Sequence, residues 1–228
     1  LGLLGDTAAA GSRCVKAVQP YAAAGGARRD GSIEQYGIWS DQQMLEDLNG
    51  CPITLVDVGS LRDPDDVAGG EPVEGTRRQQ LTEIDTRIGE VIAGGPLGAD
   101  YVVASLSDAG RGERLRLVVA RGPHFGPGLL VSESTKQRGL AQAPDVTATV
   151  LSAVGLPVPD AVQGSPLTSD PAPDNSERRA QARLTYFAEE TPSPAAQAIV
   201  VPKDSPIQTL ADLKGKKVAV TKAAGTHY

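Results

Sequence analysis

The stretch Ala99–Gly110 (ADYVVASLSDAG) constrains the fold more than any other part of the chain. Its unbroken run of apolar, strand-forming residues predicts a strand that is buried on both faces, as in a parallel sheet. The run ends in Ser-Asp-Ala-Gly, which would place the carboxylate of Asp108 at the carboxyl-terminal edge of an α/β sheet. Folds of this class keep their chemistry at that edge.

A second buried strand is predicted at 53–59, and it also ends in a carboxylate, that of Asp57. Before the first strand, Thr76 can cap a helix over 76–93, in which apolar residues recur at intervals of three and four. Strand 53–59, helix 76–93 and strand 101–107 therefore predict a right-handed βαβ unit with parallel strands.

Further elements extend this pattern in both directions. We expect a helix over 2–12 stopped by Gly11, a strand at 14–18, a strand at 115–120 and a helix beginning at 144. The predicted fold class is α/β, a mainly parallel sheet with helices on both faces. The sheet core is expected to include six apolar residues: Leu55, Val56, Val102, Val103, Val118 and Val119.

Charge and hydropathy exclude two classes of partner. The net charge is −6, from 28 acidic and 22 basic residues, and no basic cluster is large enough for a nucleic-acid footprint. No apolar run reaches the roughly 18 residues that a membrane-spanning helix needs. The sequence starts at Leu1 without Met or a signal peptide, which we interpret as a fragment or a processed form.

The two cysteines, Cys14 and Cys51, each stand at the start of a predicted strand. Parallel neighbouring strands would hold them at similar height, so we expect a disulfide, of the kind that persists outside the cytoplasm. Two buried free thiols are the alternative.

Two segments resemble the alkaline-phosphatase superfamily, which includes sulfatases and cofactor-independent phosphoglycerate mutases. One is the strand that ends in Ser-Asp-Ala-Gly, where the superfamily has Ser-Asp-His-Gly. The other is Gly139–Leu151 (GLAQAPDVTATVL), followed by Gly155-Leu156-Pro157. Residues 1 to about 183 are similar to the extracytoplasmic domain of uncharacterised bacterial membrane proteins of this superfamily, which implies association with a membrane in the full-length form.

The superfamily's chemistry uses two metal ions, commonly zinc, and a Ser or Thr nucleophile. By this resemblance Asp57, Asp108 and His124 would be metal ligands. However, Leu61 and Ala109 stand where the superfamily has histidines, and the nucleophile would precede Leu1. We therefore expect no catalytic residue and no bound cofactor, with zinc or another divalent metal only if the depleted site still binds one. Alternatively, Asp57 and Asp108 cap a loop or helix through backbone N–H groups.

The composition changes after 156. Residues 157–185 are rich in Pro, Ser and Asp and are interpreted as a linker. Residues 186–228 then contain Val-Pro-Lys-Asp-Ser-Pro at 201–206 and Asp-Leu-Lys-Gly-Lys at 212–216. This segment resembles the start of the periplasmic substrate-binding proteins of aliphatic-sulfonate ABC importers, and it implies a short α/β piece of one lobe.

In that family a loop and a helix N-terminus bind the sulfonate oxyanion with backbone N–H groups. The corresponding positions here are Lys222, Ala223, Ala224, Gly225, Thr226 and His227. The family often has Gly-Ser at the start of this segment, and alanine removes that hydroxyl.

The sequence thus predicts a chimeric or truncated chain with three regions, at 1–156, 157–185 and 186–228. The leading interpretation is a non-catalytic, extracytoplasmic alkaline-phosphatase-like domain joined to a sulfonate-binding fragment, which acts through a membrane-protein partner. The alternatives are the substrate-binding component of an importer for sulfonates and a metal-dependent phosphoesterase or sulfatase.

Overall fold

The structure is a computed structural model, and it describes residues 2–39, 48, 50–61, 76–106, 116–135 and 138–171. These residues form one mixed α/β unit with three small sheets. A three-stranded parallel sheet has the order β2-β1-β3, and two antiparallel hairpins pair β4 with β5 and β6 with β7. No helix in the described part of the chain is long and apolar enough to cross a membrane.

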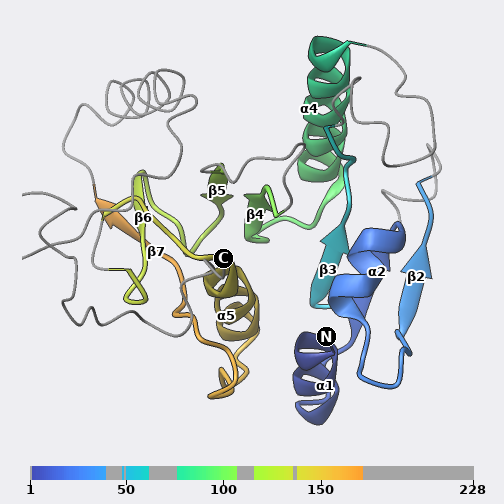
Figure 1. Cartoon of the computed structure of the whole chain (residues 1–228), viewed down its shortest axis with the longest axis vertical. Coiled ribbons are helices and arrows are strands. Elements are labelled where there is room, and N and C mark those ends of the chain that lie inside the picture. The colour runs from blue at the N-terminus through green and yellow to red at the C-terminus, as the bar shows by residue number, and fades with distance from the viewer. Residues whose placement is uncertain are drawn as a thin grey trace, which may run out of the picture. The chain divides into compact units, whose positions relative to one another are not determined.

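The parallel sheet is built from β1 (Val15–Val18), β2 (Gln35–Gly37) and β3 (Ile53–Val56). Every residue of β1 is buried, because β1 is the central strand. The helix α2 (Pro20–Gly26) packs against β1 and β3 (Figure 1). The carboxyl ends of three parallel strands therefore lie at one edge.

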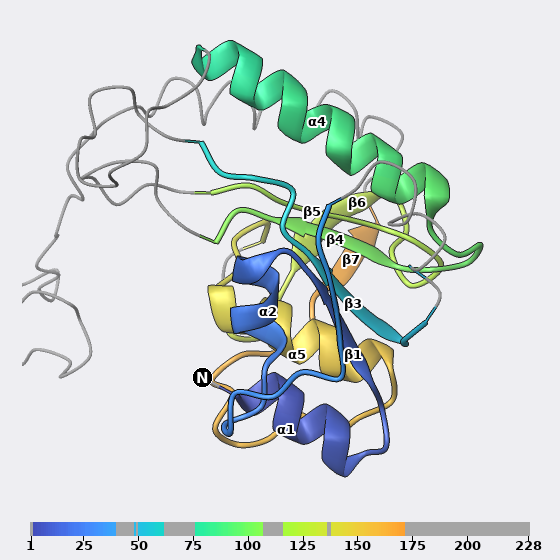
Figure 2. The same cartoon turned by 90° about the vertical axis from the view of Figure 1, so that its right-hand side faces the viewer.

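The core of the unit lies where two further helices meet this sheet. The helix α1 (Leu3–Ala10) contacts both α2 and α5 (Ala143–Ala153), as Figure 2 shows. Its Ala8 clusters with Val15 and Ile53, and all three are at most 3% exposed. Apolar side chains of β3, of α5 and of the turn after α5 pack onto this cluster, namely Leu55, Val150, Val154 and Leu156.

Several predicted helices are confirmed with small shifts of their ends. The helix α4 spans Arg77–Gly94, and Thr76 caps it in a reciprocal capping box with Gln79. The helix α1 ends before Gly11, as predicted. The strands expected at 14–18 and 53–59 are shorter but present, and they pair in parallel with Val15 opposite Ile53.

The predicted βαβ unit is wrong in its second strand. The strand β4 (Tyr101–Ala104) pairs antiparallel with β5 (Val118–Arg121), in a sheet separate from that of β3. Every residue of β4 is only half-buried, and exposure alternates along β5, which is typical of a hairpin with one face toward solvent. The apolar run specified a strand but not its partner.

The expected core needs a matching correction. Val119 is 48% exposed, so its predicted burial is wrong, and the other five expected core residues are half-buried. The fully buried side chains come instead from β1 and α5, including Val18 and Leu151. The strands β6 (Gly128–Val131) and β7 (Thr168–Pro171) form the remaining hairpin.

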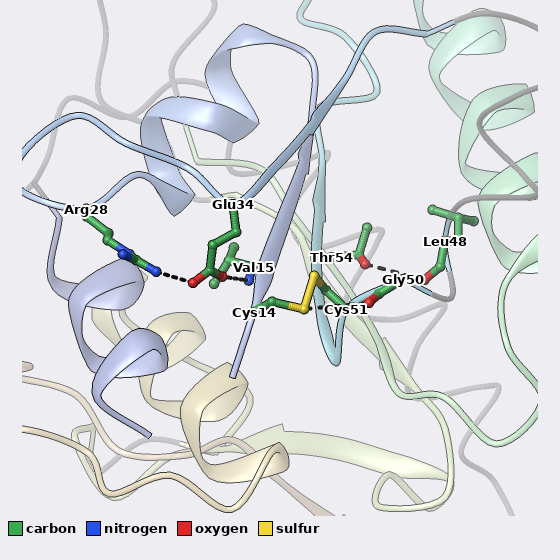
Figure 3. The surroundings of a disulfide bond; sticks show 8 residues. All are labelled: Cys14, Val15, Arg28, Glu34, Leu48, Gly50, Cys51 and Thr54. Atoms are coloured by element: carbon green, nitrogen blue, oxygen red, sulfur yellow. Dashed lines mark hydrogen bonds and ion pairs between the residues drawn. A yellow bond between two sulfur atoms is a disulfide. The ribbon is translucent and has the colours of Figure 1, made fainter. Parts of the chain in front are cut away.

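The predicted disulfide is confirmed. Cys14 and Cys51 directly precede the β1 and β3 region and are joined, with their Cα atoms 5.3 Å apart (Figure 3). On the same side of the sheet, the Glu34 carboxylate accepts the backbone N–H of Val15 at 2.9 Å and pairs with Arg28. The amino end of β1 is thus held by a covalent bond and by an ion-paired carboxylate.

We expect loss of the disulfide to lower the free energy of unfolding by roughly 3–4 kcal/mol, because it closes a loop of 37 residues. The measurement is urea unfolding of the protein with and without a thiol reductant. The double variant Cys14→Ser, Cys51→Ser serves as the control, and it should match the reduced protein and ignore the reductant. Equal stability of the oxidised and reduced protein would contradict the stabilising role assigned to this bond.

Candidate functional site

Asp57 lies at the carboxyl edge of the parallel sheet, just after β3. Its backbone N–H donates to Val18 O at 3.1 Å, which continues the ladder to β1. Its Oδ1 accepts the N–H of Gly59 at 2.9 Å, so the carboxylate closes a short loop. Gly59 has a φ of +118°, which suits glycine alone. The capping role considered for Asp57 is therefore observed.

His124 lies in the turn after β5 and is paired with Asp100, the residue that precedes β4. The Asp100 carboxylate accepts the backbone N–H of His124 at 3.1 Å, and its other oxygen lies 2.5 Å from Nδ1 of the ring. The Asp100 side chain is 14% exposed, whereas the imidazole is 73% exposed. This pair fastens the turn onto the start of β4, next to Gly122, where a side chain would collide with Asp100.

The structure thus pairs His124 with Asp100 rather than with Asp57. No group of three potential ligands, counting His, Cys, Asp and Glu, surrounds a common point among the described residues. Asp108 falls outside those residues, as do the six predicted oxyanion-binding positions at 222–227. Their roles remain predictions.

Asp145, within the segment that resembles the phosphatase superfamily, is fully buried. Its carboxylate accepts the N–H of Gln142 at 2.8 Å, the hydroxyl of Ser134 at 2.7 Å and the N–H of Ser165 at 2.9 Å. Burial by itself would raise the pKa of Asp145. The hydrogen bonds from Gln142, Ser134, Ser165 and Ser132 together outweigh it and hold the pKa below the ordinary value of 3.8.

The sequence analysis missed a contact across the carboxyl edge of the parallel sheet. The guanidinium of Arg87, on α4, stacks over the ring of Trp39 at 5.4 Å, and it donates to Val58 O at 3.2 Å. It also pairs with Glu83 one turn earlier on α4. Arg87 thus joins the chain after β2 to the chain after β3. The signal was available, because Trp39 is the single tryptophan of the chain.

Comparisons with known proteins add one finding. A stretch of 48 residues, 21% of this chain, is 50% identical to a protein of Escherichia coli (strain K12) named "Putative aliphatic sulfonates-binding protein". The stretch spans only 15% of that relative's length. No protein-family model matches the chain, and no solved structure matches it. The resemblance to sulfonate-binding proteins is therefore supported over this stretch, and that to the alkaline-phosphatase superfamily gains no support.

We expect Asp145→Asn to lower the free energy of unfolding at pH 7 by about 1–3 kcal/mol, because an amide cannot accept from donors on both sides. The pKa of Asp145 is lowered in the folded state, so its contribution is complete above about pH 4 and is lost as the pH falls further. The difference between wild type and variant should therefore shrink below pH 4.

The measurement is urea unfolding at a series of pH values. Asp160→Asn, at an exposed position in the loop after α5, removes the same charge and should change stability little. A difference between wild type and Asp145→Asn that stays constant down to pH 3 would contradict the ionised network.

Proposed function

We propose that this chain takes part in binding aliphatic sulfonates, through residues of about 186–228. The observation that carries the proposal is the 48-residue match at 50% identity to the sulfonate-binding protein of Escherichia coli. Two motifs support it, Val-Pro-Lys-Asp-Ser-Pro and Asp-Leu-Lys-Gly-Lys, which occur at the spacing of such proteins.

The proposed oxyanion contacts come from the positions 222–227. Backbone N–H groups at the start of a helix would face the sulfonate, and the positive end of the helix dipole would favour its charge. Lys222 would add a positive side chain at the same place. Because Ala223 and Ala224 have no hydroxyl, most of the affinity would come from backbone donors.

Such a segment would act with more protein than it contains. The matched stretch spans 15% of the relative's length, and a solute-binding cleft needs two lobes. The rest of the site would come from further chain or from a partner, of which an importer is the proposed case. The Cys14–Cys51 disulfide supports an extracytoplasmic location for this activity, because such bonds persist in oxidising compartments.

A second function is proposed for the α/β unit itself, that of a non-catalytic domain acting by interaction at the cell surface, attached to a membrane in its full-length form. The observation in its favour is the state of Asp57, whose carboxylate closes the loop to Gly59. Leu61 stands where the phosphatase superfamily has a histidine ligand. Both features suit a structural edge better than a metal centre.

We expect butanesulfonate to give a saturable heat in isothermal titration calorimetry of the full chain. Lys222→Ala should weaken the affinity about tenfold, because a charge-assisted contact is lost. Lys136→Ala removes the same charge outside the segment and should leave the affinity unchanged. Absence of a saturable heat, or an equal heat from a chain that ends at residue 185, would refute the proposal.

We expect zinc to leave the hydrolysis of 4-nitrophenyl phosphate by the full chain at the background rate, since Leu61 and Ala109 cannot bind a metal. The measurement is absorbance of the released phenolate with and without zinc, with a heat-denatured sample as control. A zinc-dependent rate that is abolished by Asp57→Asn would establish the phosphoesterase alternative instead.

A further inference from the structure

The carboxyl edge of the parallel sheet brings three chain segments together at the end of β1. The backbone N–H of Gln19, the residue after β1, donates to Gly37 O of β2 at 2.9 Å. On the other side, Asp57 after β3 donates to Val18 O. Gln19 therefore lies between the chain that leads to Trp39 and the chain that carries Asp57. Parallel α/β sheets bind their ligands at edges of this kind.

Gln19 has a strained backbone. Its φ of 79° and ψ of 157° lie in a region that is essentially restricted to glycine. Holding a side chain there costs on the order of 1–3 kcal/mol, and such residues cluster at ligand sites. The turn from β1 into α2 could be made by glycine without that cost. A half-buried glutamine in this place therefore indicates a use for its amide.

Aromatic residues surround the same edge, in a chain that has only one Trp, five Tyr and two Phe. Tyr21, in the first turn of α2, is 73% exposed, and Tyr36 of β2 is 50% exposed. Tyr36 is opposite Ala17, as is Leu55, and Leu55 lies against Gly25 and Gly26 of α2. Tyr36 is therefore on the sheet face that α2 covers.

The charges of the edge disfavour an anion. Asp57 and Glu83 are acidic, and the basic Arg87 is paired with Glu83. One oxygen of Asp57 serves Gly59, and the other, Oδ2, is suited to accept from a hydroxyl. The edge thus combines an amide, a carboxylate and aromatic rings, which together suit a neutral ligand with many hydroxyl groups.

We propose that the carboxyl edge of β1, β2 and β3 binds a saccharide. The C–H face of the sugar stacks on the exposed aromatic rings, and its hydroxyls donate to Asp57 Oδ2 and exchange hydrogen bonds with the amide of Gln19. Arg87 positions Trp39 by stacking on one face of the indole. This inference does not rest on sulfonate binding, which is assigned to a different part of the chain.

The fluorescence of Trp39 reports this edge alone, because the chain has no other tryptophan. The experiment titrates the full chain with maltose and with cellobiose, and we expect a saturable change of emission with at least one of them. Asp57→Asn keeps an oxygen for Gly59 and removes the charge, and it should weaken the affinity about tenfold. Asp85→Asn, exposed on α4, is the matched control and should bind as wild type does.

Gln19→Gly separates a binding role from a structural one. It relieves the backbone strain, so we expect it to raise the free energy of unfolding by up to about 1 kcal/mol while it abolishes the response to the sugar. A purely structural glutamine would change stability without changing affinity. Wild type that gives no saturable response to either sugar, or equal affinity in wild type, Asp57→Asn and Gln19→Gly, would overturn the proposal.

Discussion

The buried carboxylate of Asp145 is the interaction on which the packing around α5 depends. It binds the start of α5 through Gln142, the chain after β6 through Ser134 and the chain before β7 through Ser165. Since α5 also packs on the core of Ala8, Val15 and Ile53, this one group connects the β6–β7 hairpin to the parallel sheet. An ionised group is tolerated there because its donors replace the water that it loses.

The two ends of the parallel sheet are built differently. At the amino end, the disulfide and the Glu34 carboxylate fix β1 against its neighbours. At the carboxyl end, a strained Gln19, a short loop closed by Asp57 and the stacked Arg87 hold the chain in less favourable conformations. A firmly tied amino end is what lets the opposite edge retain strain, because the cost is met by the surrounding core.

Sequence patterns predicted the elements that carry their own local signals. Thr76 with Gln79 marks the start of α4, Gly11 ends α1, and the two cysteines correctly imply that β1 and β3 are neighbours. The partner of β4 was not predictable, because an apolar run specifies burial and not pairing, and β5 supplied a nearer partner. The helix α2 was missed, since its entry through Gln19 uses a backbone conformation that propensities assign to glycine.

The candidate site was predictable only at Asp57, where the rule that strands end at the chemistry applied directly. The Arg87–Trp39 contact joins residues far apart in sequence, and no local pattern encodes it. The same edge also explains why two ligand chemistries are assigned to separate parts of the chain. An oxyanion needs free backbone N–H donors, but those of Gln19, Asp57 and Gly59 are already donated to Gly37 O, Val18 O and the Asp57 carboxylate. Sulfonate binding therefore has to come from residues beyond this sheet, while the edge itself offers acceptors and rings.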